Sequence, residues 1–141
     1  MDVTISRIEE LKTDLIKDLC IKAEMKIDKI NGKFFNDEKN IFLVAFDEKS
    51  PCGFLYGYLL ECFQTERPYM FLYSIDVFDG YKRRGVGEKL IEELKDIAIK
   101  YKCSEIFVLT NDSNNAAKGL YEKIGAIREN MDDVMYVYNI E

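Results

Sequence analysis

Residues 70–101 decide the fold; they read MFLYSIDV, then FDGYKRRGVG, then EKLIEELKDIAIKY. The first part is an apolar run of strand length. The second is a basic turn that contains three glycines, and the third repeats apolar residues at helical spacing with Glu and Lys opposite. A strand that leads through a glycine-rich turn into a helix is a common way to hold a phosphate. We therefore expect an anion site at this turn, with the rest of the chain supporting it.

The composition sets limits on the class of protein. A length of 141 residues fits one domain, residues 1–141, and 48% apolar residues suffice for a core. The net charge of −6 argues against a nucleic-acid partner and is compatible with a cationic one, such as an amine. No apolar run reaches the ~18–20 residues of a membrane span and no signal-like N-terminus is present, so we expect a cytoplasmic protein without a membrane partner.

The chain contains no histidine. This excludes Ser-His-Asp and Cys-His nucleophilic machinery, and it argues against a zinc site, so no metal is expected. Acid–base work must fall to Tyr, Asp, Glu, Cys, Lys, a backbone group or water. The four cysteines lie far apart without a C-x-x-C pair, and we expect buried thiols in a reducing compartment.

The N-terminal half predicts a strand, a long helix and three further strands. Residues 3–8 alternate as a half-buried strand does, and from Glu9 onward apolar residues at helical spacing predict a helix that Asn31-Gly32 stops. Residues 34–40 read as a connector that buries two phenylalanines, with a substrate-contacting loop as the alternative. Residues 41–46, 52–63 and 69–78 predict an antiparallel run of strands.

The C-terminal half predicts a parallel crossover and a closing hairpin. The helix after the glycine turn runs to Tyr101, and residues 106–109 form a short strand parallel to the one before the turn. Capping residues at 110–115 open a helix that Gly125 closes. Residues 126–129 and 134–140 read as a hairpin. The fold class is therefore α/β (α+β), one domain with a mixed, mostly antiparallel sheet of about seven strands flanked by helices.

Gly85 and Gly87 allow the backbone of the turn to bend tightly and to approach a ligand closely. The amides of residues 83–88 would point into one concavity at the helix N-terminus, where Lys82, Arg83 and Arg84 add positive charge. Taken alone, a G-x-G turn is better explained by a plain turn with a solvated basic cluster. The spacings of the P-loop and of the Rossmann fingerprint are both missing.

Two segments together resemble the GNAT superfamily of N-acetyltransferases. Residues 75–87, IDVFDGYKRRGVG, are similar to its acyl-CoA-binding motif, a strand ending in valine followed by a short turn and [QR]-x-x-G-x-[GA]. Residues 114–126, NNAAKGLYEKIGA, resemble its N-x-x-A-x-x-L-Y-x-K-x-G-F signature. With the order of the elements, the resemblance covers nearly the whole chain. It implies a GNAT-like fold and direct transfer of an acetyl group from acetyl-CoA to the primary amine of a small molecule or peptide.

The resemblance also implies roles for individual residues. The backbone of Ile75, Asp76 and Val77 would hydrogen-bond the pantetheine arm, with the Val77 amide also holding the oxyanion. Asn114 would contact the cofactor near the pantetheine, and Tyr121 would protonate the leaving sulfur. The pyrophosphate would lie against Lys82, Arg83, Arg84, Gly85, Val86, Gly87 and Glu88. From the residues alone, Asn114 reads as a helix cap and Tyr121 as a core aromatic.

The identity of the general base stays open, because Leu109 stands where some members of the superfamily carry a Glu. Asp76 is the first candidate, with Glu61, Asp112 or a water chain as alternatives. A solvent-facing position on an alternating strand explains Asp76 equally well. Two smaller departures are Lys82, which replaces the usual Gln or Arg, and Ala126, which replaces Phe. A non-catalytic acyl-CoA-binding or sensing module is the rival function.

The C-terminal residues 128–140, RENMDDVMYVYNI, are similar to the tail of the aminoglycoside 3-N-acetyltransferases. An aminoglycoside acceptor is a minor reading, because that subfamily carries Asp where Asn111 stands here. The sequence does not identify the acceptor. We expect the loops at 31–40, 64–68 and 130–133 to form its pocket. A homodimer through the C-terminal strands is compatible with the pattern.

Overall fold

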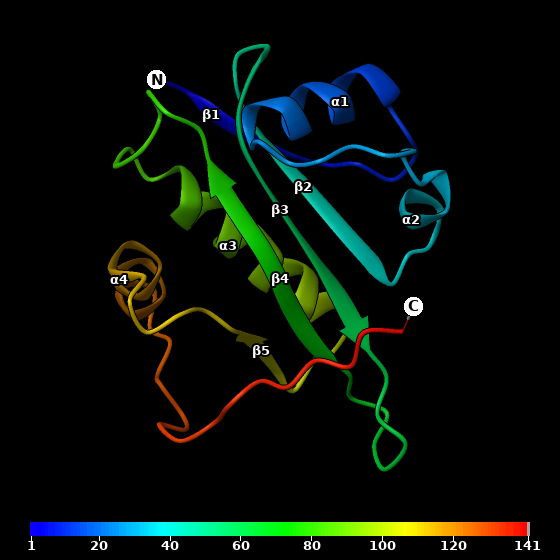
Figure 1. Cartoon of the computed structure of the whole chain (residues 1–141), viewed down its shortest axis with the longest axis vertical. Coiled ribbons are helices and arrows are strands. Elements are labelled where there is room, and N and C mark those ends of the chain that lie inside the picture. Colours follow the sequence, from blue (N-terminus) through cyan, green and yellow to red (C-terminus); the bar gives the residue numbers. More distant parts are fainter. Residues whose placement is uncertain (141) are drawn as a thin grey trace. The chain divides into compact units, whose positions relative to one another are not determined.

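The computed structural model describes residues 1–140. The chain divides into two compact units, Met1–Leu109 and the residues from Thr110 onward. The first unit holds all the strands and three of the helices among the described residues, and the second holds one helix (Figure 1). No described helix has both the length and the apolar character that crossing a membrane requires.

A single sheet of five strands organises the first unit. Its order is β1-β2-β3-β4-β5, with antiparallel neighbours except for β5, which runs parallel to β4. The mixed, mostly antiparallel sheet is confirmed. The strands are β1 Val3–Arg7, β2 Asn40–Asp47, β3 Ser50–Leu60, β4 Tyr69–Val77 and β5 Glu105–Val108.

Helices cover both faces of this sheet. α1 (Thr13–Lys22) and α2 (Gly32–Asn36) lie over one face, and α3 (Val86–Lys100) lies over the other (Figure 1). α3 connects β4 to the parallel β5, as the strand–turn–helix pattern predicts.

The core has two layers because the central strands are apolar on both faces. In β2 the residues from Ile41 to Ala45 are all buried. One layer packs under α1 and α2 and includes Ile16, Leu19, Phe42, Val44 and Phe54. On the α3 side, the helix buries residues such as Leu90 and Leu94 at helical spacing. Each fully buried leucine stabilises the fold by roughly 1.5–3 kcal/mol.

The first helix ends earlier than the sequence predicts. α1 stops at Lys22, and the expected continuation to Ile30 is wrong. The amide of Met25 donates to the carbonyl of Cys20 at 2.9 Å, and the amide of Glu24 donates to that of Ile21 at 3.1 Å. This is a Schellman termination, with Glu24 at φ 56° in the position that glycine usually takes. Residues 25–31 consequently form a loop.

Asn31-Gly32 begins a helix instead of stopping one. The Asn31 side chain accepts a hydrogen bond from the Lys33 amide at 3.1 Å and caps α2. The buried Phe35 of this short helix joins the core layer under α1. The two phenylalanines are therefore buried or partly buried, as predicted, but on a helical turn instead of an extended connector.

The second unit contains α4 (Asn115–Lys123) but no strand among its described residues. Gly125, just beyond the C-cap Ile124, closes α4 as predicted: its φ is 99°, and the Ala126 amide donates to the Tyr121 carbonyl at 2.9 Å. The hairpin expected at 126–129 and 134–140 is not formed, so the sheet has five strands and not about seven. A lone two-stranded hairpin is marginal in water, and this unit offers it no third strand. The predicted dimer interface was to be formed by these C-terminal strands, which are not present among the described residues.

Candidate functional site

An irregularity in the β3–β4 pairing shapes the centre of the sheet. Tyr56 pairs with Ser74 but Gly57 pairs with Leu72, so Tyr73 is an extra residue on β4. Gly57 permits this arrangement, because a Cβ there would lie 2.4 Å from the Phe71 carbonyl oxygen. The bulge turns the Tyr73 ring toward the face of α1 and α2, where its centroid lies 5.4 Å from that of Tyr56.

Beyond this bulge, β4 presents an open edge. β5 pairs with β4 only from Tyr69 to Leu72, whereas β4 continues to Val77. Within the unit Met1–Leu109, no strand occupies that side of residues 73–77. Backbone groups on such an edge can pair with an extended ligand as an additional strand would. Ile75, Asp76 and Val77 lie on this edge, where the resemblance expects the pantetheine arm.

The turn after β4 has the backbone of an anion-binding nest. Arg83 and Gly85 have φ angles of 63° and 80°, and Arg84 between them does not have a positive φ. This alternation of handedness turns successive amides into one concavity. Gly85 is the N-cap of α3 and provides no side-chain cap, so the first amides of the helix remain available to a ligand on its axis.

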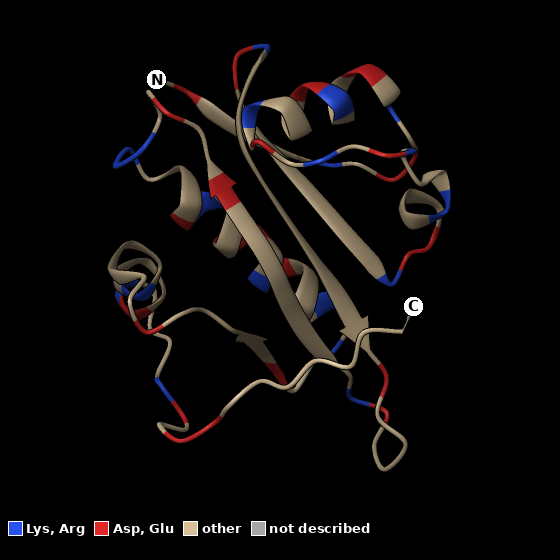
Figure 2. Ribbon diagram, in the orientation of Figure 1, with Lys and Arg blue, Asp and Glu red and all other residues tan. Residues whose placement is uncertain are grey.

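The turn contains three consecutive basic residues, Lys82, Arg83 and Arg84, drawn blue on the ribbon in Figure 2. Lys82 Nζ lies 3.3 Å from Asp79 Oδ1, and both side chains are exposed. Arg84 Nη1 lies 4.0 Å from the sulfur of Met1. One ion pair with Asp79 leaves an excess of positive charge, which fits a diphosphate group.

Asp76 is the single charged residue of β4 (Figure 2). It pairs with Phe54 across the sheet and is half-buried, so its carboxyl is shielded from solvent in part. Burial is the main cause that raises the pKa of the Asp76 carboxyl, Asp79 raises it further, and Lys82 opposes both. A carboxylate with a raised pKa in such a setting is a candidate general base.

A cavity of about 270 Å³ lies between the residue 25–31 loop, α1, α2 and the sheet. Phe42, Phe54 and Tyr56 line it with mutually parallel rings, at interplanar angles of 8–11°. Phe34 and Tyr58 stand nearly perpendicular to Tyr56, at 83° and 85°. Burial is the leading cause that raises the pKa of both tyrosines, so the phenols stay neutral near pH 7.

The sequence located this cavity only in part. Of the expected acceptor loops, 31–40 contributes Asn31, Phe34 and Phe35, whereas 64–68 does not line it. Phe34 and Phe35 are packed in the core as the connector interpretation predicts, and they also line this cavity. The 25–30 segment was missed because a helix was expected there. The signal that could have revealed the cavity is the period-two spacing of Phe54, Tyr56 and Tyr58.

In the second unit, Asn114 acts as the cap of α4. Its Oδ1 accepts a hydrogen bond from the Ala117 amide at 3.0 Å, so the helix-cap interpretation is confirmed. The role implied by the superfamily resemblance is not excluded by this bond, because the side-chain amide nitrogen of asparagine has two further donors.

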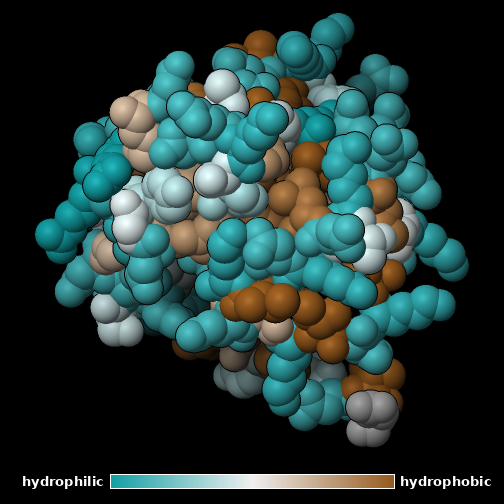
Figure 3. Space-filling model, turned by 90° about the horizontal axis from the view of Figure 1, so that it is seen from above, coloured by the Kyte–Doolittle hydropathy of each residue, from teal (hydrophilic) through white to brown (hydrophobic). Residues whose placement is uncertain are grey.

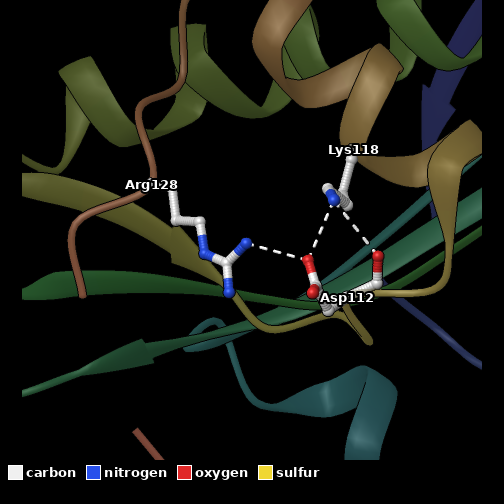
Figure 4. Close-up of polar contacts among 3 residues, drawn as sticks. All are labelled: Asp112, Lys118 and Arg128. Atoms are coloured by element: carbon white, nitrogen blue, oxygen red, sulfur yellow. Dashed lines mark hydrogen bonds and ion pairs between the residues drawn. The ribbon is translucent and has the colours of Figure 1, made fainter. Parts of the chain in front are cut away.

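Asp112 precedes α4 and is hydrogen-bonded both to Lys118 of α4 and to Arg128 in the segment that follows the helix (Figure 4). Its Oδ1 accepts from Lys118 Nζ at 2.9 Å and from Arg128 Nη1 at 2.8 Å. The hydrogen bond from Lys118, followed by that from Arg128, lowers the pKa of the Asp112 carboxyl. A carboxylate stabilised as an anion is a poor proton acceptor, which argues against Asp112 as the general base.

Tyr121 lies on α4 and is partly buried. Burial raises the pKa of its hydroxyl. The phenol therefore holds its proton near neutral pH, which is the state a proton donor requires.

A comparison with known protein families shows to which family the chain belongs. The family described as "Acetyltransferase (GNAT) family" matches residues 8–126. The chain belongs to this family. The match begins at the end of β1 and extends through α4, so it includes the open edge of β4, the turn and the helix that carries Tyr121.

Several acetyltransferases resemble the chain in sequence or structure. Thialysine N-epsilon-acetyltransferase of Bos taurus is 28% identical over 81 residues, which are 57% of this chain and 48% of that protein. The aligned part thus spans about half the length of that relative. An aminoglycoside acetyltransferase from an uncultured soil metagenomic sample, solved with sisomicin, has a TM-score of 0.87 and 24% identity over 99% of this chain and 97% of its own.

A ribosomal-protein-alanine N-acetyltransferase from Brucella melitensis has a TM-score of 0.78 and 21% identity, covering 99% of this chain and all of its own. At such identities these structures establish the GNAT fold alone. Aminoglycoside acetyltransferases of the 6′-N type also match. The likeness of the C-terminal residues to the 3-N branch therefore gains no support.

Proposed function

We propose that this GNAT protein is an acetyl-CoA-dependent N-acetyltransferase that acts on a primary amine of a small molecule or peptide. The observation that supports this most directly is the open edge of β4 leading straight into the nest at the start of α3. An extended arm could pair with the strand edge while a diphosphate at its end binds the amides of the nest. We also propose that residues 1–141 work as a single domain, because the family match extends across both units.

The cofactor would be held mainly by backbone groups. Ile75, Asp76 and Val77 offer the strand edge, and Arg83 to Gly87 offer the concavity for the pyrophosphate. The side chains of Lys82, Arg83 and Arg84 add charge-assisted contacts. Asn114 would reach the cofactor with the donors that its capping bond does not use.

The amine must be deprotonated before it attacks, because an alkylammonium has a pKa of about 10.4. Asp76 is the proposed base, acting directly or through a water molecule, since its pKa is raised and its strand carries the proposed thioester site. Glu61 is a weaker candidate because it lies at the exposed end beyond β3. The Val77 amide would stabilise the tetrahedral oxyanion. Tyr121 would donate a proton to the departing thiolate.

The relatives act on different acceptors by their names, so the acceptor of this protein must be identified by experiment. The relative from Bos taurus carries thialysine in its name, which favours a small amine. An aminoglycoside acceptor is favoured only by fold similarity. An acetyl-transfer screen over amino acids, aromatic and aliphatic monoamines, polyamines, aminoglycosides and N-terminal peptides, followed by thiol release, tests the proposal.

A tyrosine variant separates an enzyme from a binding module. We expect Tyr121→Phe to lower kcat by about 10²-fold or more while the Kd for coenzyme A, measured by calorimetry, stays within about twofold. Tyr69→Phe is the matched control, because Tyr69 lies at the start of β4 and away from the open edge. Protein that binds coenzyme A but acetylates no amine in the screen would refute the enzymatic proposal and leave the sensing module.

A further inference from the structure

We infer that the acceptor is a primary monoamine carried on one aromatic ring or a comparable apolar group, bound in the cavity under α1 and α2. This inference rests on the proposed transferase function and narrows its substrate class. It is supported by the size of the cavity, by the kinds of side chain that line it, and by its position relative to Asp76.

The lining of the cavity is mostly apolar. It includes six aromatic side chains, together with Ile16, Leu19, Met25, Ile27 and Ile30. The aromatic residues are Phe34, Phe35, Phe42, Phe54, Tyr56 and Tyr58. Away from the open rim, this lining packs well against an apolar group of the acceptor. It offers few hydrogen-bond partners to the hydroxyl groups of an acceptor. A sugar-like acceptor would leave several of its polar groups without hydrogen bonds, at a cost of ~1–3 kcal/mol for each.

The charges of the lining also oppose a polycation. Its charged residues are Lys26, Asp28 and Lys29, which sum to one positive charge. An acceptor with several ammonium groups would meet two lysines and a single carboxylate. A monoamine needs only one favourable environment for its ammonium, and aromatic faces provide it through cation–π attraction.

The arrangement of the rings suits one ammonium and one ring. Phe34 is edge-on to both Tyr56 and Tyr58, with centroid separations of 6.2 and 5.9 Å. Tyr73 extends the group, lying 5.7 Å from Tyr58 at an angle of 89°. Perpendicular walls of this kind contact a planar group on its face and on its edge at once.

The size of the cavity selects small acceptors. Its volume of about 270 Å³ is just below the ~300–1,000 Å³ that ligand pockets commonly have. A one-ring amine fits such a space, whereas a multi-ring aminoglycoside would extend into solvent. Seen from above, the molecular surface is mostly hydrophilic and apolar side chains reach it in separate groups (Figure 3). The mostly apolar lining of this open cavity differs in character from that hydrophilic surface.

The position of Asp76 orients the acceptor. Phe54 lines the cavity and pairs with Asp76, and Tyr56 pairs with Ser74 on the same face. Along β3, Phe54 and Tyr56 are separated by about 7 Å. A ring held beside Tyr56 thus places an amine on a short carbon spacer near Asp76, at the open edge where the thioester is proposed.

The test compares acceptors at equal concentration by kcat/KM. We expect 2-phenylethylamine to exceed spermidine and sisomicin by at least about tenfold. Tyr58→Ala should lower kcat/KM for 2-phenylethylamine by about tenfold, mainly through KM, because a ring wall is lost. Tyr58→Phe should stay within about threefold of the parent. Phe63→Ala is the matched control, since Phe63 is a fully exposed aromatic outside the cavity.

Each failure has a distinct signature. If sisomicin or spermidine is the better acceptor, the substrate inference is overturned while the transferase function stands. If coenzyme A binds and no amine is acetylated, both fail together. A calorimetric titration with 2-phenylethylamine in the presence of coenzyme A gives a readout without turnover; saturable binding that Tyr58→Ala weakens supports the inference. Circular dichroism of each variant shows that it is folded.

Discussion

Replacing Gly57 with alanine should destabilise the protein through one steric contact. A Cβ at this position would lie 2.4 Å from the Phe71 carbonyl oxygen and 3.3 Å from the Leu72 Cα. Real Cβ atoms essentially never approach within 3.0 Å, so β3 and β4 must separate locally by about 0.6 Å, which is the difference between 3.0 and 2.4 Å. The backbone dihedral φ of Gly57 is not positive, so the cost is steric and not conformational.

The size of the effect follows from this displacement. Forcing extra volume into a packed region typically costs about 1–3 kcal/mol. Lengthening a neighbouring backbone hydrogen bond until it breaks adds roughly 0.5–1.5 kcal/mol. Alanine restricts the unfolded chain more than glycine does, which returns about 0.4–1 kcal/mol. We expect a net loss of about 2–3 kcal/mol in the free energy of unfolding, equivalent to a fall of about 8 °C in Tm.

The assay is thermal and urea unfolding followed by circular dichroism. The matched control is Gly119→Ala, because Gly119 lies inside α4 and its added Cβ would meet nothing within 4 Å. That variant should gain about 0.5–1 kcal/mol from helix propensity. A Gly57→Ala protein as stable as the parent would refute the close approach of the strands. Gly53→Ala provides a second test of the same reasoning, since its Cβ would lie 2.7 Å from the Asp76 carbonyl oxygen.

Three further substitutions test the charges. Asp76→Asn should lower kcat/KM by about 10²-fold or more and remove the rise of activity with pH that deprotonation of Asp76 causes. Because burial raises the folded-state pKa of Asp76, the variant should also have the higher Tm at pH 7, and this advantage should shrink as pH falls through the raised pKa and be absent below the ordinary value of 3.8. Arg84→Ala should weaken coenzyme A binding by about tenfold at low salt and by less at high salt, measured by calorimetry. Asp112→Asn should lower the Tm at pH 7 and should lower it by progressively less as pH falls below 3.8, because the lowered pKa of Asp112 contributes stability that is lost as pH falls through it. An effect that does not change with pH would contradict this interpretation of its ion pairs.

Short-range sequence patterns predicted those elements whose formation depends mainly on neighbouring residues. The strand, turn and helix of residues 70–101 follow from apolar spacing and glycine, and the structure has them as β4, the nest and α3. The end of α1 could not be predicted in the same way. Its terminating position is filled by Glu24, a residue that seldom adopts a left-handed conformation, so the sequence contains no stop signal there.

Features that depend on distant partners were harder to predict. Residues 134–140, VMYVYNI, have the composition of a strand, yet strand formation requires a neighbour that pairs with them. The aromatic cavity likewise arises when the loop at 25–31 meets β2 and β3. The motifs pointed to the turn and strand edge where we propose the cofactor, while the proposed acceptor side depended on a register that no short motif encodes.

The register of β4 explains why the proposed base and the cavity share a face. With strict alternation, Asp76 would lie on the same face as Leu72, which is buried on the α3 side with Met70. The extra residue at Tyr73 reverses this, so that Asp76 faces the aromatic layer beside Phe54. Because the bulge needs the missing side chain of Gly57, one glycine on β3 determines where a carboxylate on β4 points. A variant that straightened the bulge would therefore turn the proposed base away from the cavity, which is lined by α1, α2, β2 and β3 and not by β4, even though every proposed cofactor contact at the nest remained.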